Sequence, residues 1–229
     1  MLSKLPTWEK LAKEIIWKQL GSIENKTILD FGSGTGITAN YYAENNKVIA
    51  IEPSQEILAE QCNTNGYQQI IGSTEKLKEL RNESFDLIIC HNVLEYTNDR
   101  EEIVNEFYRL LKPNGKLSIV KHNRSGRVMQ MVVLLNNFEE ANNLLDGKNS
   151  NAQKFGVINY YEDNDVLDWC NKLQLSKVYG LRTFWDLQQN QEIQKDGQWQ
   201  KNMVDIEMRV SEINDYRNIA FFHHLIFTK

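Results

Sequence analysis

Five short apolar runs, separated by segments with helical periodicity, constrain the fold of the first half of the chain more than any other feature. Near-continuous apolar strands that alternate with helices indicate a parallel sheet covered on both faces. The predicted strands are Thr27–Phe31, Lys47–Ile51, Gln69–Ile71, Phe85–Cys90 and Lys116–Val120; the predicted helices are Trp8–Leu20, Gly36–Ala43, Ser54–Thr64, Thr74–Leu80 and Arg100–Leu111.

The second half is less regular. We predict a helix over Arg127–Leu145, in which Val128, Met131, Val132 and Leu135 form an apolar stripe, and a second helix over Asp163–Leu173. A polar loop is predicted over Asp146–Phe155, strands over Ser176–Phe184 and Ala220–Phe227, and a mostly helical insertion over residues 186–218.

Without an internal repeat or a linker-like change of composition, the 229 residues are expected to form one α/β domain. Its expected parts are a leading helix (residues 1–24), a core (25–121), a lid or substrate segment (122–160) and the C-terminal part of the sheet (161–229). A hydrophobic content of 41% argues against disorder. A net charge of -5 argues against a globally basic nucleic-acid binder. With no long apolar run, no signal peptide and no metal-ligand spacing among Cys62, Cys90 and Cys170, we expect a cytoplasmic protein without a metal.

A glycine-rich turn follows the first predicted strand, in the segment Ile28–Gly36 (ILDFGSGTG). Glycines at such a place allow a tight turn and a close approach of a ligand to the backbone. Glu52 lies 20 residues after Gly32, at the end of the next strand, where a carboxylate can accept ribose hydroxyl protons. A dinucleotide fingerprint is weakened by its register, because Ile37 or Ala39 takes the third glycine position. A Walker loop lacks its G-K-[ST], and a turn without a ligand is the remaining alternative.

The pattern D-x-G-x-G-x-G followed by an acidic residue resembles the cofactor loop of class I S-adenosylmethionine-dependent methyltransferases of the type 11 kind. Three further segments resemble this family in the same order, namely 72–77 (GSTEKL), 85–95 (FDLIICHNVLE) and 110–117 (LLKPNGKL). The resemblance implies a Rossmann-like, doubly wound, mostly parallel sheet of seven strands with an antiparallel last strand, and S-adenosylmethionine as the cofactor.

The resemblance also implies a cofactor site. Its residues are Asp30, Gly32, Ser33, Gly34 and Gly36 at the methionine end, Glu52 at the ribose, Pro53 and Ile57 beside the adenine, Ser73, Thr74 and Glu75 near the adenine edge, and His91, Asn92 and Val93 beside the sulfonium. Ser73 or Thr74 could instead cap a helix. His91 could be a base or only a neighbour of the cofactor, and no catalytic residue is assigned. A carboxylate acceptor would need no base at neutral pH.

The second half is similar to a narrower branch, the enzymes that methyl-esterify 5-carboxymethoxyuridine at the tRNA wobble position. The similar segments are 91–96, 121–126, 136–138 and 180–184. The branch implies that the acceptor is bound by Tyr96, His122, Asn123, Arg124, Arg182, Trp185, Tyr216 and His224. His223 and His224 should point to opposite sides of the last strand, and Trp185 and Tyr216 could equally belong to the core.

Charge gives partial support to an anionic acceptor. Six Lys or Arg and no acidic residue lie between Arg109 and Arg127, which could attract a phosphate backbone or a small anion, or could be a solvated face. The chain departs from the branch in its leading helix, where the branch uses Arg near the cofactor carboxylate and only Lys10 and Lys13 are available for that role, and at Trp185 and Glu212. We therefore expect methyl transfer to an oxygen, with a carboxylate among the candidates, of a modified tRNA uridine or a small acidic metabolite. A non-catalytic cofactor-binding module and a nicotinamide oxidoreductase are the alternatives.

Overall fold

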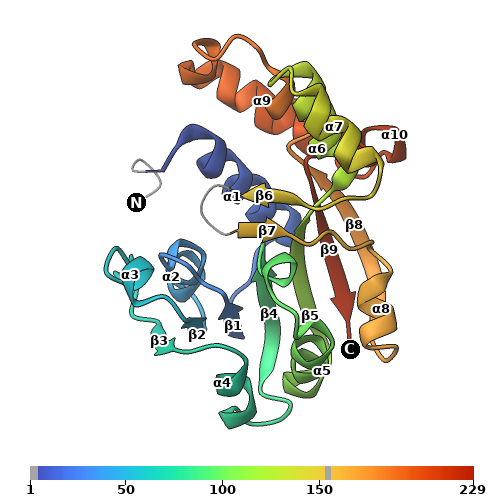
Figure 1. Cartoon of the computed structure of the whole chain (residues 1–229). Coiled ribbons are helices and arrows are strands. Elements are labelled where there is room, and N and C mark those ends of the chain that lie inside the picture. Colours follow the sequence, from blue (N-terminus) through green and yellow to red (C-terminus); the bar gives the residue numbers. More distant parts are fainter. Residues whose placement is uncertain (1–4, 153–155) are drawn as a thin grey trace.

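A seven-stranded sheet forms the centre of the computed structural model, which describes residues 5–152 and 156–229 (Figure 1). Its strand order is β3-β2-β1-β4-β5-β9-β8. Neighbouring strands from β3 to β5 run parallel, whereas β9 is antiparallel to both β5 and β8. The strands are β1 (Thr27–Phe31), β2 (Lys47–Glu52), β3 (Gln68–Ile71), β4 (Phe85–His91), β5 (Leu111–His122), β8 (Gln174–Leu181) and β9 (Phe222–Thr228). The predicted doubly wound sheet with an antiparallel last strand is confirmed.

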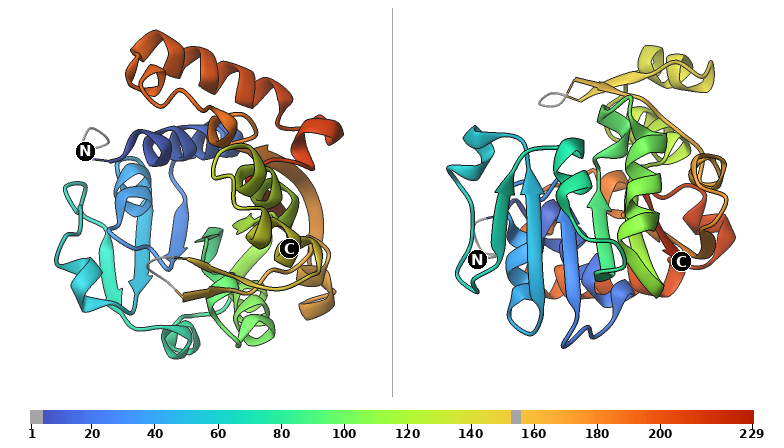
Figure 2. Two further views of the ribbon diagram at one scale, coloured as in Figure 1. Left: turned by 45° about the horizontal axis from the view of Figure 1, so that its top comes forward. Right: turned by 90° about the horizontal axis from the view of Figure 1, so that it is seen from below.

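Helices cover both faces of the sheet (Figure 2). One core cluster joins α5 (Arg100–Leu110) and α8 (Asp165–Trp169) to side chains such as Ile88 and Cys90, and α4 (Thr74–Glu79) adds Leu77 to it. The other cluster joins α1 (Thr7–Leu20), α2 (Ile37–Ala43) and α9 (Gly197–Val210) to Leu87 and Ile89. Successive residues of β4 thus enter opposite clusters, which explains why the central strands are apolar without interruption.

The carboxyl ends of the parallel strands meet at one end of the sheet, below α6 (Arg124–Val133), α7 (Phe138–Leu145) and the hairpin of β6 (Ser150–Ala152) and β7 (Gly156–Ile158) (Figure 1). In sheets of this kind ligands bind in the crevice outside these strand ends. The remaining elements are α3 (Gln55–Leu58), α10 (Asn214–Arg217) and the 3-10 helices η2 (Leu94–Tyr96), η3 (Trp185–Leu187) and η4 (Ile193–Lys195).

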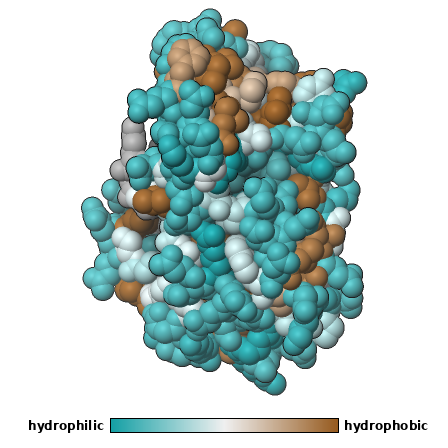
Figure 3. Space-filling model, turned by 45° about the vertical axis from the view of Figure 1, so that its right-hand side comes forward, coloured by the Kyte–Doolittle hydropathy of each residue, from teal (hydrophilic) through white to brown (hydrophobic). Residues whose placement is uncertain are grey.

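The prediction of a single helix over Arg127–Leu145 is wrong. Asn136 adopts a left-handed backbone with φ of 50° between α6 and α7, and the Asn137 side chain accepts the N–H of Glu140 to cap α7. Of the expected apolar stripe, Met131 is buried, but Val132 and Leu135 are exposed. Figure 3 shows apolar surface at the end of the molecule that carries these helices.

Three other predicted boundaries are also wrong. The expected polar loop over Asp146–Phe155 contains strand β6, which pairs with β7 directly after the loop, and the part of it at 153–155 lies outside the described residues. The helix expected over Ser54–Thr64 is limited to α3, and the one over Asp163–Leu173 is limited to α8. The segment 186–218 is mostly helical, as predicted.

Candidate cofactor and acceptor site

The turn between β1 and α2 is open to a ligand at one glycine. Gly32, Gly34 and Gly36 all have φ between 57° and 73°, a left-handed backbone that favours glycine. A Cβ added at Gly32 would lie 2.3 Å from Val93 Cγ2, and one at Gly36 would lie 1.8 Å from the Tyr67 hydroxyl. A Cβ at Gly34 would meet no atom within 4 Å. The turn is therefore packed on two sides and free at Gly34.

Glu52, at the end of β2, is tied to this turn. Its Oε2 accepts the Gly34 N–H at 2.9 Å and its Oε1 accepts the Ser54 N–H at 2.9 Å. Each carboxylate oxygen has a further lone pair, so the group can accept two more hydrogen bonds. Ser54 also caps α3 through the Ile57 N–H, which fixes the chain after the exposed Pro53.

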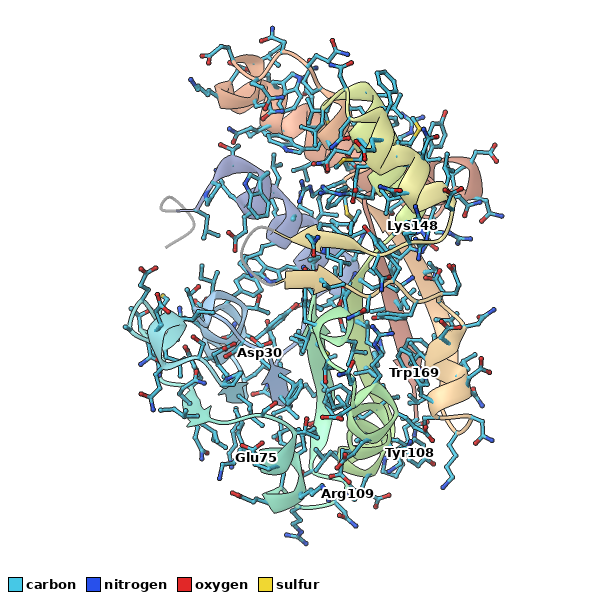
Figure 4. All side chains as sticks on the ribbon, in the orientation of Figure 1. Asp30, Glu75, Tyr108, Arg109, Lys148 and Trp169 are labelled. Atoms are coloured by element: carbon cyan, nitrogen blue, oxygen red, sulfur yellow. The ribbon has the colours of Figure 1, made fainter. Side chains whose placement is uncertain are left out.

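Opposite charges lie together at the end of β1. Asp30, labelled in Figure 4, is buried, and its Oδ2 has no hydrogen-bond partner among the described residues. Burial raises the pKa of Asp30 to about 7, against the charge of Lys13. The Lys13 ammonium, on α1, donates to Thr38 Oγ1 at 3.2 Å, and burial lowers its pKa. An anion and a cation side by side complement the ammonium and carboxylate of a bound amino acid.

The segment after β3 approaches the end of β2, because the Gly72 N–H donates to the Glu52 backbone oxygen at 3.2 Å. Ser73 occupies the N-cap position of α4 without a side-chain cap bond, so the capping alternative is wrong for Ser73. The carboxylate of Glu75 accepts the Ser73 N–H instead, at 2.9 Å, and this bond lowers the pKa of Glu75. Thr74 is the first residue of α4 and directly follows Ser73.

The end of β4 adjoins the glycine turn. Val93 packs against Gly32, while Asn92 has φ of 55° and donates its N–H to the Val120 backbone oxygen. His91 Nε2 lies 2.8 Å from Ser118 Oγ. Burial, followed by the charges of His224 and Lys13, lowers the pKa of His91 well below its ordinary value.

A second cluster lies at the ends of β5, β8 and β9. His122 Nε2 lies 3.3 Å from the Tyr96 hydroxyl, and its ring centroid is 5.6 Å from that of Phe221. The guanidinium groups of Arg182 and Arg127 lie 4.8 Å and 5.7 Å from the centroid of the same Phe221 ring. Three buried nitrogens of this cluster have no partner among the described residues: His122 Nδ1, Arg127 Nε and Arg182 Nε. Burial and the neighbouring arginines lower the pKa of His122 to about 3.

The position of Arg182 is fixed by its surroundings. It has φ of 62° and is ion-paired with Asp186, whose Oδ1 also accepts from Gln130 Nε2 at 3.0 Å. The buried carboxylate of Glu207 accepts the three backbone N–H groups of residues 183–185. The turn after β8 is therefore built around carboxylates that hold the guanidinium in place.

Comparison with known proteins assigns the central part of the chain. Residues 29–119 match the family model Methyltransf_11, described as a methyltransferase domain. Over these residues the chain is similar to a methyltransferase domain. Two solved structures that share the fold, from Listeria monocytogenes and Mesorhizobium loti, are named S-adenosylmethionine-dependent methyltransferases.

The chain is 28% identical over 109 residues to thiol S-methyltransferase TMT1B of Rattus norvegicus, covering 44% of this chain and 45% of that protein. The chain spans about half the length of such curated relatives. A tRNA 5-carboxymethoxyuridine methyltransferase of Escherichia coli O157:H7 is 24% identical over 94% of this chain and 87% of its own. A putative methyltransferase of Haloferax volcanii, solved in complex with the Trm112 methyltransferase activator, shares the fold with a TM-score of 0.61 at 13% identity, covering 95% of this chain and 87% of that one.

The residues around the open glycine fit this cofactor. The unpaired Oδ2 of Asp30 suits an ammonium and Lys13 suits a carboxylate. The free lone pairs of Glu52 suit two ribose hydroxyls, and Gly34 leaves the backbone accessible. The sequence offered Lys10 and Lys13 equally as replacements for the arginine of the branch, and the position of Lys13 in α1 gave no means of choosing it.

Several residues predicted to bind the acceptor have other surroundings. Trp185 is buried against Trp199, with ring centroids 5.0 Å apart, which matches the alternative that it belongs to the core. The ring of His224 is fully buried and lies within hydrogen-bond distance of Ser118 on one side and Gln19 on the other. Tyr216 lies on α10 against Phe184.

Asn123 and Arg124 hold the covering segment together. The Asn123 side chain caps α6 and donates to the backbone oxygens of Asn218 and Ala220. Arg124 lies 4.5 Å from the Tyr160 ring centroid and donates to the backbone oxygen of Lys148, labelled in Figure 4 where the chain leaves α7. Arg127, which sequence reasoning did not assign, lies in the acceptor cluster; the basic run that includes it was the available signal.

Among the described residues, no group of three or more His, Cys, Asp or Glu could hold a metal ion. A search of the same residues finds no helix long and apolar enough to cross a membrane.

Proposed function

We propose that the chain transfers the methyl group of S-adenosylmethionine to an oxygen of an acidic acceptor. The observation that carries the proposal is the set of unpaired buried nitrogens on His122, Arg127 and Arg182 around Phe221. Buried polar nitrogens without partners are costly, at about 1–3 kcal/mol each, unless a ligand satisfies them. An anionic group carried on a flat or apolar body matches both the donors and the ring.

On the cofactor side, we propose that Asp30 and Lys13 bind the amino-acid end and Glu52 the ribose. Gly32, Gly34 and Gly36 give backbone access, Ser33 adjoins them, and Pro53, Ile57, Ser73, Thr74 and Glu75 surround the adenine. When bound, the cofactor supplies an electrophilic methyl group on a positively charged sulfur. The chain contributes alignment, which can lower a barrier by about 7–11 kcal/mol in favourable cases. Helices α6 and α7 and the β6–β7 hairpin exclude water above the strand ends.

Two acceptors are proposed. The similarity to the Escherichia coli protein over nearly the whole chain supports a carboxylated tRNA uridine. The ion pairs within the basic run support a small acidic molecule instead. Arg109 pairs with Glu106, Lys112 with Asp86 and Lys121 with Asp163, so these cations are not free for a phosphate backbone. The cytoplasm, which contains both acceptors, is the proposed location.

The test uses S-adenosylmethionine with a labelled methyl group. The purified protein is incubated with small RNA and, separately, with protein-free metabolites, both from a strain that lacks the gene. Label in RNA supports the tRNA acceptor, and label only in the metabolite fraction supports the small acidic acceptor. Tight cofactor binding without transfer to either fraction would contradict the proposed methyl transfer and favour a non-catalytic binding module.

A further inference from the structure

A continuous series of hydrogen bonds between buried or partly buried side chains runs from α1 across three strands to the carboxyl end of β4. His224 Nδ1 on β9 lies 2.7 Å from Gln19 Oε1 on α1, and His224 Nε2 lies 2.8 Å from Ser118 Oγ on β5. The same Ser118 oxygen lies 2.8 Å from His91 Nε2 on β4. The strand register creates this proximity, because Val120 pairs with both His91 and His224. This series of hydrogen bonds is complete only because β9 is inserted beside β5.

The direction of every hydrogen bond in this series is fixed by Gln19, at the α1 end. Gln19 Nε2 lies 3.2 Å from the backbone oxygen of Gly180, which can only accept, so the amide oxygen of Gln19 faces His224. His224 must therefore donate from Nδ1. A neutral imidazole has a single N–H, so His224 Nε2 accepts the Ser118 proton. The Ser118 oxygen then accepts from the Nε2–H of His91.

His91 is left with the lone pair of its Nδ1. This nitrogen has no hydrogen-bond partner among the described residues, and the His91 side chain is partly exposed beside the glycine turn. The charged or titratable groups that act on it are His224 from β9 and Lys13 from α1. Burial lowers the pKa of His224 to about 3 and that of His91 well below 6.5, so both rings are neutral near pH 7. The lone pair is therefore available throughout the physiological range.

We propose that His91 is the proton acceptor of the methyl transfer and that the methylated atom is a hydroxyl oxygen, with Ser118, His224 and Gln19 as positioning residues. This inference rests on the proposed function and narrows its acceptor. The hydroxyl oxygen forms a bond to the methyl carbon while the carbon–sulfur bond breaks and its electron pair stays on sulfur. The hydroxyl proton passes to His91 Nδ1 and then to solvent. The hydroxyl proton becomes strongly acidic as the new oxygen–methyl bond forms, so a weak base is sufficient to accept it.

A carboxylate acceptor does not match this arrangement. It brings no proton, and its negative charge would face the Nδ1 lone pair instead of a donor. The anionic group of the acceptor is therefore assigned to the cluster of Arg127, Arg182 and His122, and its hydroxyl to His91. The two products differ chemically, since a methyl ester is cleaved by mild alkali and a methyl ether is not.

The first experiment reports on His91 without any turnover. In protein labelled with nitrogen-15 histidine, NMR of the ring nitrogens should show His91 protonated at Nε2 and unprotonated at Nδ1. Ser118→Ala removes the acceptor of the Nε2–H, so His91 should then populate both tautomers. Ser176 is an exposed serine of β8 that takes no part in this series of hydrogen bonds. Ser176→Ala is therefore the matched control and should leave the His91 signals unchanged. A proton on Nδ1 in the parent protein would overturn the proposal.

The second experiment uses the labelled-methyl reaction with the small RNA and metabolite fractions. The labelled product should resist mild alkali, and His91→Gln should lower the turnover rate by 100-fold or more while the Kd for S-adenosylmethionine stays within about threefold. Label released as methanol would overturn the hydroxyl acceptor and leave methyl transfer intact. Equal turnover by His91→Gln would remove His91 as the proton acceptor. If no fraction is labelled, the proposed function itself fails, whereas the nitrogen measurement still decides the His91 tautomer.

Discussion

Replacement of Asp30 by Asn should stabilise the cofactor-free protein, and increasingly so as the pH rises. The Asp30 side chain is 4% exposed, and burial raises the pKa of its carboxyl from 3.8 to about 7. Between these values the unfolded chain has lost a proton that the folded protein still holds, so the stability of the parent falls as the pH rises. Asn carries no ionisable proton, and its variant escapes this loss.

The size of the effect follows from the shift. One pKa unit corresponds to about 1.4 kcal/mol, and the folded carboxyl is half ionised at pH 7, so the parent should lose about 2 kcal/mol relative to Asp30→Asn between pH 5 and pH 7. Above about pH 7 the folded carboxyl also ionises, and the difference should level off. Contributions that do not depend on pH, such as altered packing, cancel in this comparison.

Urea unfolding of both proteins at pH 5, 6, 7 and 8 without cofactor measures the difference. Asp86→Asn is the matched control. Burial alone would raise the pKa of Asp86, but hydrogen bonds from Lys112 and the Thr27 N–H lower it below 3.8. Asp86 is therefore ionised in both states above pH 5, and its variant should differ from the parent by a constant amount. A constant difference for Asp30→Asn as well would refute the account of Asp30 as a carboxyl with a raised pKa.

The same ionisation governs cofactor affinity, because only the carboxylate form of Asp30 attracts an ammonium. With a pKa of about 7, the ionised fraction falls about tenfold from pH 8 to pH 6, and the Kd for S-adenosylmethionine should rise by the same factor. Asp30→Asn should bind weakly at every pH. A parent Kd that is flat over this range would argue against contact between Asp30 and the cofactor ammonium.

Four further predictions concern the site and its support. Gly34→Val should raise the Kd for S-adenosylmethionine at least tenfold by calorimetry, and an unchanged Kd would contradict the site. Its folding cost should be only about 1–2 kcal/mol from the left-handed backbone, since the added side chain enters open space. Glu52→Ala should weaken cofactor binding similarly, and by freeing two backbone donors should destabilise the fold by about 1–3 kcal/mol in urea; equal affinity would remove it from the ribose site. Gly126→Ala should destabilise by about 1–3 kcal/mol or more, because its Cβ would lie 2.0 Å from the Ala220 backbone oxygen; unchanged urea unfolding would refute this close approach. Arg182→Lys should lower turnover more than cofactor affinity, and equal losses in both would exclude it from acceptor binding.

The part of the fold that follows from the sequence is the part set by local patterns. The strands β1 to β5 are each recognisable as apolar runs, and the prediction that His223 and His224 face opposite sides of β9 is confirmed. His223 contacts Asp163 and the Arg217 backbone, whereas His224 contacts Ser118 and Gln19. Alternation along a strand needs no knowledge of the tertiary structure.

The remainder depends on contacts between distant segments. The β6–β7 hairpin lies against η2, with the Asn159 N–H donating to the Glu95 backbone oxygen, and no local pattern announces it. The meeting of His122, Arg127 and Arg182 requires the placement of β9 beside β5. The break between α6 and α7 was missed although it has a local signal, since consecutive asparagines at 136 and 137 are typical of a helix end followed by an N-cap.

The order of strands in the sheet has a consequence for how the chain is made. Strands β1 to β5 can assemble in parallel as they leave the ribosome, because each strand from β2 onward finds one neighbour among segments that are already synthesised. Strand β8 cannot, since its only sheet neighbour is β9, which is made later. Until Phe222–Thr228 emerges, the nascent chain carries an unpaired β8 and an open edge on β5, which invites pairing with other chains. The insertion of β9 pairs β8 and covers the open edge of β5 in one step, and it leaves β8 as the edge strand of the finished sheet.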